Sequence, residues 1–313
     1  MYKYIVYLAL LLCTKMCVGC DICGCNANNL SLGVQPQFNR HFVGLRFQQS
    51  SYISKTHENS LDPSKSQGTS EHFRSIQLWG RVAISKRIQL LAFIPYKMQY
   101  QKQGNESTQL KGLGDISVLG NYMLFNTTET TSKKWRHALQ IGVGIKLPNG
   151  KSDALQNGLM IHTNLQLGSG SFDFPFYANY TLRHKHFGSM IECQYVKNGT
   201  NKQAFHFGNR FIQSTRFFYW KEKKKWQFLP QIGYGYETAE FDKQRNTVQT
   251  YTGGNIVYGN VGIDVFYKNV SFNIHVQQPL QQNLGEGYVK SNARFLSNFI
   301  YLLNTKKIKK NEQ

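Results

Sequence analysis

The stretch Leu139-Gln-Ile-Gly-Val-Gly-Ile-Lys-Leu147 places an apolar residue at every second position, with polar or small residues between them. A repeat of two residues is typical of an extended strand, because neighbouring side chains of a strand point to opposite faces. The same alternation returns at 172–182 and at 270–277. Strands of this kind predict a sheet with an apolar medium on one side and water on the other.

Working outward from this stretch, the alternation predicts twelve strands. They are expected at about 40–49, 71–84, 87–102, 113–126, 136–148, 170–184, 187–198, 203–220, 225–239, 255–268, 269–278 and 290–304. A further segment, 161–167, is assigned to a loop because another full strand would make the count odd. Three prolines, Pro95, Pro175 and Pro230, fall inside the runs. Proline cannot donate to a strand ladder, so bulges or local bends are expected there.

The connections between these strands are mostly long and short in turn. Bacterial outer-membrane barrels have long outer loops, tight periplasmic turns and an even strand count, with both termini in the periplasm. The predicted fold class is therefore all-β: a transmembrane antiparallel up-and-down β-barrel of about 12 strands over residues 40–304, in the outer membrane of a Gram-negative cell. A soluble β-sandwich is the rival fold, but its strands are usually shorter.

The two ends of the chain have compositions of their own. Residues 1–19 contain Lys3, then an apolar run, then small residues, which predicts a secretory signal peptide. Residues 20–39 are expected to form a Cys-containing periplasmic segment or a partial plug, and residues 305–313 a basic tail. No apolar stretch after residue 20 reaches the roughly 20 residues that a membrane helix needs.

The formal net charge of +20 could indicate nucleic-acid binding. However, an exported chain without a nucleic-acid module rarely meets that partner, and membrane lipid and a small solute are the partners expected. The basic residues gather at the short connections, where they fit solvated turns beside lipid headgroups. These clusters are Lys86-Arg87, Lys133-Lys134, His184-Lys185-His186, Lys221–Lys225 and Lys268.

Three cysteines, Cys20, Cys23 and Cys25, lie directly after the predicted signal. Thiolates bind soft ions such as copper(I) or zinc, so a metal site is one interpretation. A lipid on Cys20 and a disulfide formed in an oxidising compartment are the other two. A closed zinc site needs four ligands, and the sequence nearby offers no fourth. No cofactor is expected.

The polar faces carry charges of both signs. If the barrel is narrow, such residues either pair across the lumen or line a selective channel. Leu139, Ile141, Val143, Phe272 and Ile274 should face outward, and Asn179 inward. The candidates for lining the lumen are Arg46, Arg81, Asp115, Lys146, Asp173, Arg183, Glu192, His206, Arg210, Arg216, Asp264 and His275.

Catalysis is not expected from this sequence. Some barrels are lipases, but a lipase in the barrel wall would need a serine and a histidine side by side on the outer face. The predicted outer faces show no such histidine. An open lumen with a basic excess would instead favour anionic or polar solutes.

Three glycine-containing motifs follow one another: Gly112-Leu-Gly-Asp115, Lys146-Leu-Pro-Asn-Gly150 and Gly168-Ser-Gly-Ser-Phe-Asp173. In this order the chain resembles the outer-membrane barrels grouped with the meta-pathway phenol-degradation proteins, especially Bacteroidetes members described as transporters. Those members also begin CDxCGC and continue with a PQF…FVGLR stretch, as at 36–46 here. The resemblance implies an outer-membrane barrel that takes up hydrophobic or aromatic compounds. Asn149 departs from the threonine usual in the family.

Overall fold

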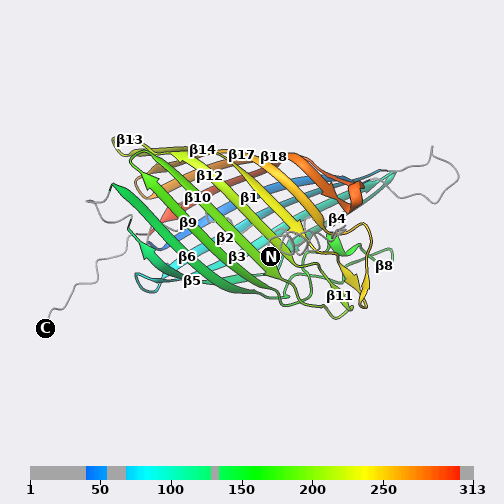
Figure 1. Cartoon of the computed structure of the whole chain (residues 1–313). Helices are drawn as coiled ribbons and strands as arrows, with labels where there is room; N and C mark the ends of the chain where they lie inside the picture. The colour runs from blue at the N-terminus through cyan, green and yellow to red at the C-terminus, as the bar shows by residue number, and fades with distance from the viewer. Residues whose placement is uncertain (1–39, 55–67, 128–133, 304–313) are drawn as a thin grey trace, which may run out of the picture.

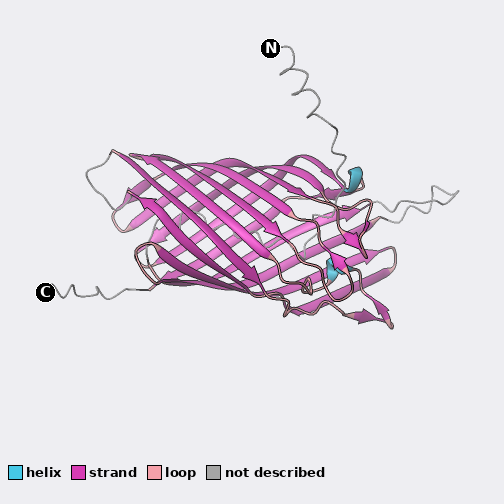
Figure 2. Ribbon diagram, turned by 60° about the horizontal axis from the view of Figure 1, so that its bottom comes forward, coloured by secondary structure: helices cyan, strands magenta, loops and turns pink. Residues whose placement is uncertain are grey.

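The protein is a long antiparallel β-barrel closed by twelve wall strands (Figure 1). The computed structural model describes residues 40–54, 68–127 and 134–303. The predicted signal peptide, the segment 20–39 with its cysteines, Lys133 and the basic tail lie outside the described residues. Strands make up nearly all of the described structure (Figure 2), and within those ranges no helix is long and apolar enough to cross a membrane.

Each wall strand pairs with its neighbours in chain order. Closure comes from β20, which pairs with both β18 and the first strand, β1, for example Phe299 opposite Leu45. The wall strands are β1 (Phe42–Ser54), β2 (Thr69–Ala83), β3 (Ile88–Gln103), β5 (Ser117–Asn126), β6 (Trp135–Lys146), β9 (Phe174–His184), β10 (Phe187–Lys197), β12 (Arg210–Tyr219), β14 (Trp226–Ala239), β17 (Gly254–Tyr267), β18 (Val270–Leu284) and β20 (Arg294–Leu302).

Shorter elements extend the wall at its two ends. β4 (Glu106–Leu113) pairs with the C-terminal half of β3, and β13 (Lys221–Lys223) pairs with β14. The remaining short elements are β7 (Leu155–Gln156), β8 (Leu159–Met160), η3 (Thr163–Leu165), β11 (Phe205–His206), β15 (Lys243–Gln244), β16 (Thr247–Val248), η4 (Gly285–Gly287) and β19 (Val289–Ser291).

The alternation located every wall strand, but some boundaries differ from the prediction. The strand expected at 113–126 begins only at Ser117, the separate strand β4 before it was not predicted, and the strand expected at 203–220 begins only at Arg210. The residues before Arg210 belong to a loop whose strand β11 pairs with β15, outside the barrel wall. Segment 161–167 is a loop, as predicted, and contains η3.

Short turns and long loops lie at opposite ends of the barrel. The short turns include 84–87, 185–186 and 268–269, and β13 marks this end in Figure 1. The long connections carry β8 and β11 at the other end. Because β1 starts and β20 finishes at the short-turn end, the two ends of the barrel wall lie on the same side, as predicted.

Side chains alternate between the two faces of the wall as the sequence predicts. On the outside, Ile141, Val143 and Phe272 are 43%, 55% and 45% exposed. Facing inward, Lys146 and Asn179 are 7% and 1% exposed. An apolar exterior around a polar interior reverses the usual arrangement of a soluble protein and is typical of a membrane barrel.

Each strand proline lies where the ladder on one side is interrupted, but the bulges expected at these prolines are not found. The register shifts of the described wall strands lie elsewhere, between Met123 and Phe125 and between Val257 and Tyr258. Pro95 lies where the neighbour of β3 changes from β5 to β4, and its carbonyl accepts a hydrogen bond from the Gly114 backbone. Pro175 follows the end of the β6–β9 ladder, and Pro230 lies between the β12 and β13 pairings. On its other side each proline stays paired with the neighbouring strand.

Candidate functional site: the barrel interior

The connection 147–173 folds into the mouth of the barrel at the long-loop end. Its residues Ile161 and Leu165 share one buried cluster with Tyr52 on β1 and Tyr258 on β17. These two strands are far from β6 and β9, which the connection joins, so the segment reaches across the lumen. Gln166 is fully buried and bonds the backbone of Ala154 and Ile161, which holds the segment in shape. We call residues 147–173 the inward segment.

A buried ionic network attaches the inward segment to the wall. Lys146 pairs with both Asp115 and Asp173. Asp115 accepts hydrogen bonds from the backbone of Gly150, at 2.9 Å, and of Ser169, at 2.8 Å. The three glycine motifs of the sequence therefore meet at one place. The two carboxylates share one ammonium group, and backbone N–H groups supply further hydrogen bonds to Asp115, so this network serves chiefly to hold structure.

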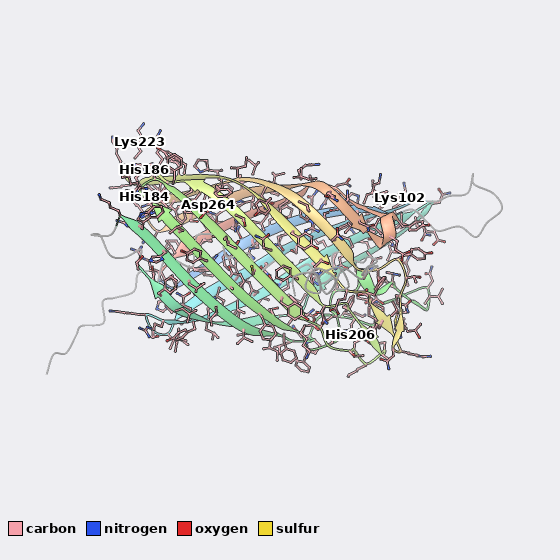
Figure 3. The ribbon with its side chains drawn as sticks, viewed as in Figure 1. Lys102, His184, His186, His206, Lys223 and Asp264 are labelled. Atoms are coloured by element: carbon pink, nitrogen blue, oxygen red, sulfur yellow. The ribbon has the colours of Figure 1, made fainter. Side chains whose placement is uncertain are left out.

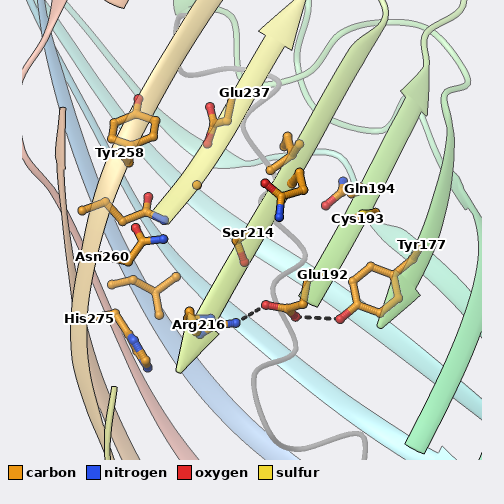
Figure 4. Close-up of a pocket in the computed structure, with 15 residues that line it drawn as sticks. Tyr177, Glu192, Cys193, Gln194, Ser214, Arg216, Glu237, Tyr258, Asn260 and His275 are labelled. Atoms are coloured by element: carbon orange, nitrogen blue, oxygen red, sulfur yellow. Dashed lines mark hydrogen bonds and ion pairs between the residues drawn. The ribbon is translucent and has the colours of Figure 1, made fainter. Parts of the chain in front are cut away.

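The middle of the lumen contains a second pair, between Arg216 on β12 and Glu192 on β10 (Figure 4). The hydroxyl of Tyr177 donates to the other oxygen of Glu192 at 2.7 Å. These groups border a cavity of about 50 Å³, which also reaches Asn260 and His275. His275 Nε2 lies 2.8 Å from Asp264.

A third pair lies closer to the long-loop end. Arg294 Nη1 is 2.7 Å from Glu237, and Nη2 donates to the Tyr52 hydroxyl at 3.0 Å. Glu237 and Arg294 line a cavity of about 60 Å³ together with Arg210, which is 4% exposed. Within the described part of the chain, Arg210 Nε and Nη1 have no hydrogen-bond partner. This side chain is an unneutralised cation facing the lumen.

Aromatic rings crowd the interior toward the short-turn end. The guanidinium of Arg46 lies 4.3 Å above the Trp79 ring, and that of Arg81 lies 4.9 Å from the Phe42 ring. Trp79 also stacks on Phe93. Cation–π contacts of this kind stabilise buried guanidinium groups. Side chains therefore fill much of the lumen, and each of the two cavities has room for a few waters.

Nearly all the residues predicted to line the lumen point into the barrel or its mouth. The exception is His206: it lies in β11, in a loop outside the wall, and its ring is 3.4 Å from Thr200. The prediction for His206 is wrong because the strand was extended too far toward its N-terminus. The inward residues are Arg46, Arg81, Asp115, Lys146, Asp173, Arg183, Glu192, Arg210, Arg216, Asp264 and His275.

Sequence reasoning left Tyr177 and Arg294 out of the candidates. Both follow the inward alternation of their strands, in step with Asn179 and Asn298. That alternation could have identified them. Their partners, Glu192 and Glu237, come from other strands, and the sequence gives no signal for such a pairing.

The outer face does contain a serine and a histidine side by side, contrary to the prediction. Ser70 Oγ lies 3.3 Å from His72 Nε2 on β2. Within the described residues no third group bonds the other ring nitrogen of His72. A catalytic triad needs a nucleophile, a base and a group that orients the base, so it is incomplete here. Among the described residues no group of three or more His, Cys, Asp or Glu is arranged to hold a metal ion.

The closed antiparallel barrel, apolar outside and polar inside, has the fold of outer-membrane β-barrel proteins. It is similar to an outer membrane channel from Pseudomonas putida F1, with a TM-score of 0.60 and 13% identity over 84% of this chain and 96% of that chain. The transport unit of the autotransporter AIDA-I from Escherichia coli has a TM-score of 0.48 and 13% identity, covering 89% of this chain and 95% of that one. No protein-family model matches the sequence, and no curated protein does either.

Proposed function

We propose that the protein is an outer-membrane channel or transporter that lets a small solute pass without an energy source. The observation that carries this proposal is the pairing of an apolar exterior with an interior rich in charged and amide side chains. A barrel that served only as an anchor could fill its interior with apolar side chains. A polar interior lets water and solutes approach the lumen.

The balance of charge inside the barrel supports a preference for anionic or polar solutes. Buried cations outnumber buried carboxylates, and Arg210 has free donors on the lumen side. The buried cations are Arg46, Arg81, Lys97, Lys146, Arg183, Arg210, Arg216 and Arg294, and the buried carboxylates of the wall and the ionic network are Glu71, Asp115, Asp173, Glu192, Glu237 and Asp264. The rings around Trp79 would suit a solute with an aromatic part, as the family resemblance implies.

The small size of the two cavities adds a condition to this proposal. A solute larger than a few waters can pass only if the interior opens, and the inward segment is the part best placed to move. It is one connection, fixed to the wall by the Lys146 network rather than by a strand ladder. We therefore include displacement of this segment in the proposed transport step.

The proposal also includes export by the signal peptide 1–19 and a periplasmic position for residues 20–39. The rival function, metal handling by Cys20, Cys23 and Cys25, predicts one zinc or copper per chain that survives dialysis and is lost in the triple cysteine variant. The channel proposal predicts that the same variant keeps its solute flux. Metal analysis and flux on one preparation separate the two.

The direct test is a swelling assay on liposomes that contain the purified barrel. Uptake of small carboxylates and of neutral amides of matched size should exceed that of protein-free liposomes, with the carboxylates faster. Swelling no faster than in protein-free liposomes, for the wild type and for a variant with a loosened inward segment, would contradict the proposal.

A further inference from the structure

The outer face of β2, β3 and β4 changes character abruptly near the long-loop end. One row of paired residues, Ile76, Tyr96 and Leu113, is apolar and 43%, 43% and 56% exposed. The next row outward contains Arg74 and Lys111 on either side of a methionine. Rows on one face are two residues, or about 7 Å, apart along a strand. The border between apolar and basic surface is therefore sharp.

The basic rows are hollowed into a groove of about 410 Å³. Beyond Arg74 and Lys111, the following rows bring His72 beside Tyr100 and Gln109, and then Lys102. Lys102 lies at the end of the barrel opposite Lys223 and the turn histidines (Figure 3). We call this groove, which is lined by His72, Arg74, Met98, Gln99, Tyr100, Gln109 and Lys111, the basic groove; Lys102 lies in the row beyond it.

The charge of the basic groove is not neutralised by the protein. Within the described residues, no ion pair involves Arg74, Lys102 or Lys111. The outward positions of the three strands contain no carboxylate. Adjacent strands are about 4.8 Å apart, so Arg74 and Lys111 flank a site about 10 Å wide that their flexible side chains can close upon.

We propose that the basic groove binds the phosphate groups of lipopolysaccharide, the phosphorylated glucosamine lipid of the outer leaflet. The apolar row below the groove would contact the acyl chains, and the cations above it would contact the phosphates. Charge-assisted hydrogen bonds from arginine and lysine to phosphate are roughly twice as strong as hydrogen bonds between neutral groups. The inference rests on the proposed outer-membrane location with the long loops outside. It does not depend on solute passage.

Native mass spectrometry of the detergent-solubilised barrel tests the proposal. Wild type, the double variant Arg74→Gln/Lys111→Gln and the control Lys223→Gln/Lys225→Gln are each titrated with bis-phosphorylated lipid A. The control removes the same charge from an exposed turn at the other end. We expect at least a tenfold loss of lipid affinity in the double variant and none in the control. Heat-dependent gel mobility checks that each variant is folded.

The choice of ligand identifies the source of the phosphate. Wild type should prefer the bis-phosphorylated lipid to its dephosphorylated form, to phosphatidylglycerol and to inorganic phosphate. Equal binding of any of these three, or equal lipid A binding by the two double variants, would overturn the proposal. Solute flux separates the two proposals, because the double variant should keep it. Wild type that passes solute but does not bind lipid A would leave the channel proposal standing. Wild type that binds lipid A but does not pass solute would leave the lipid site standing.

Discussion

At the residue scale, Lys146 joins the three glycine-containing motifs, because it pairs with Asp115 of the first and Asp173 of the third. The sequence predicts that Lys146, Asp115 and Asp173 face inward, because each follows the polar alternation of its strand or turn. It cannot predict that they meet, since Asp115 and Asp173 come from different connections. Their meeting depends on strand register and on the path of the inward segment.

Replacing Lys146 by methionine should destabilise the barrel by about 3–5 kcal/mol, because two buried carboxylates lose their common cation. The inward segment should also detach more easily. We expect a lower midpoint for unfolding in detergent and a larger or more variable ion conductance. Lys223→Met, at the exposed end of β13, serves as the control. Equal stability of the two variants would refute the role given to the network.

At the element scale, alternation was sufficient to locate strands because each wall strand has lipid-facing and lumen-facing residues in turn. It failed where a strand leaves the wall. β4 was missed because residues 106–112 are mostly polar on both faces, and His206 was misplaced because a loop strand also alternates. The inward segment was recognised as a loop, but its path into the lumen depends on contacts that no local pattern encodes.

Gly168 tests the packing of the inward segment. A Cβ atom there would collide with Asp115 Oδ1 and with the backbone of Gly150, whereas one at Gly259 would meet only Leu280 at ordinary contact distance. We expect Gly168→Ala to lower the free energy of unfolding by about 1–3 kcal/mol through overpacking. Gly259→Ala should have little effect. Urea unfolding of both variants in lipid vesicles would measure the difference, and equal values would argue against the described contact.

The outward face of β17 tests lipid contact. Val261 is 61% exposed near the middle of the strand. Val261→Arg should cost about 2–4 kcal/mol of folding free energy in a bilayer, and Tyr267→Arg, at the strand end, about 0–1 kcal/mol. Unfolding in vesicles gives both values. Similar costs at the two depths would mean that this face does not cross a bilayer.

At the scale of the whole molecule, orientation follows from the connections more firmly than from charge. The short-turn end is basic, as predicted, but the long-loop end also carries Lys102, Lys151, Lys243 and Lys290. Charge alone would therefore not distinguish the two ends. The short turns that join consecutive wall strands lie at the end where β1 begins and β20 finishes, and this placement does distinguish the two ends.

Labelling of single cysteines in intact cells should show the orientation. Asn105→Cys, in the turn between β3 and β4 at the long-loop end, should react with a membrane-impermeant maleimide. Lys223→Cys should react only after the outer membrane is permeabilised. The opposite pattern would invert the barrel, and it would move the basic groove to the inner leaflet.

The central claim is that the polar interior conducts. Single-channel recording in planar bilayers under a potassium chloride gradient tests it most directly. Wild type should give discrete current steps, and their reversal potential should be displaced from zero toward the equilibrium potential of chloride. Arg210→Gln should shift the reversal potential back toward zero. An absence of steps in both the wild type and Lys146→Met, with folded barrel in the bilayer, would contradict the account.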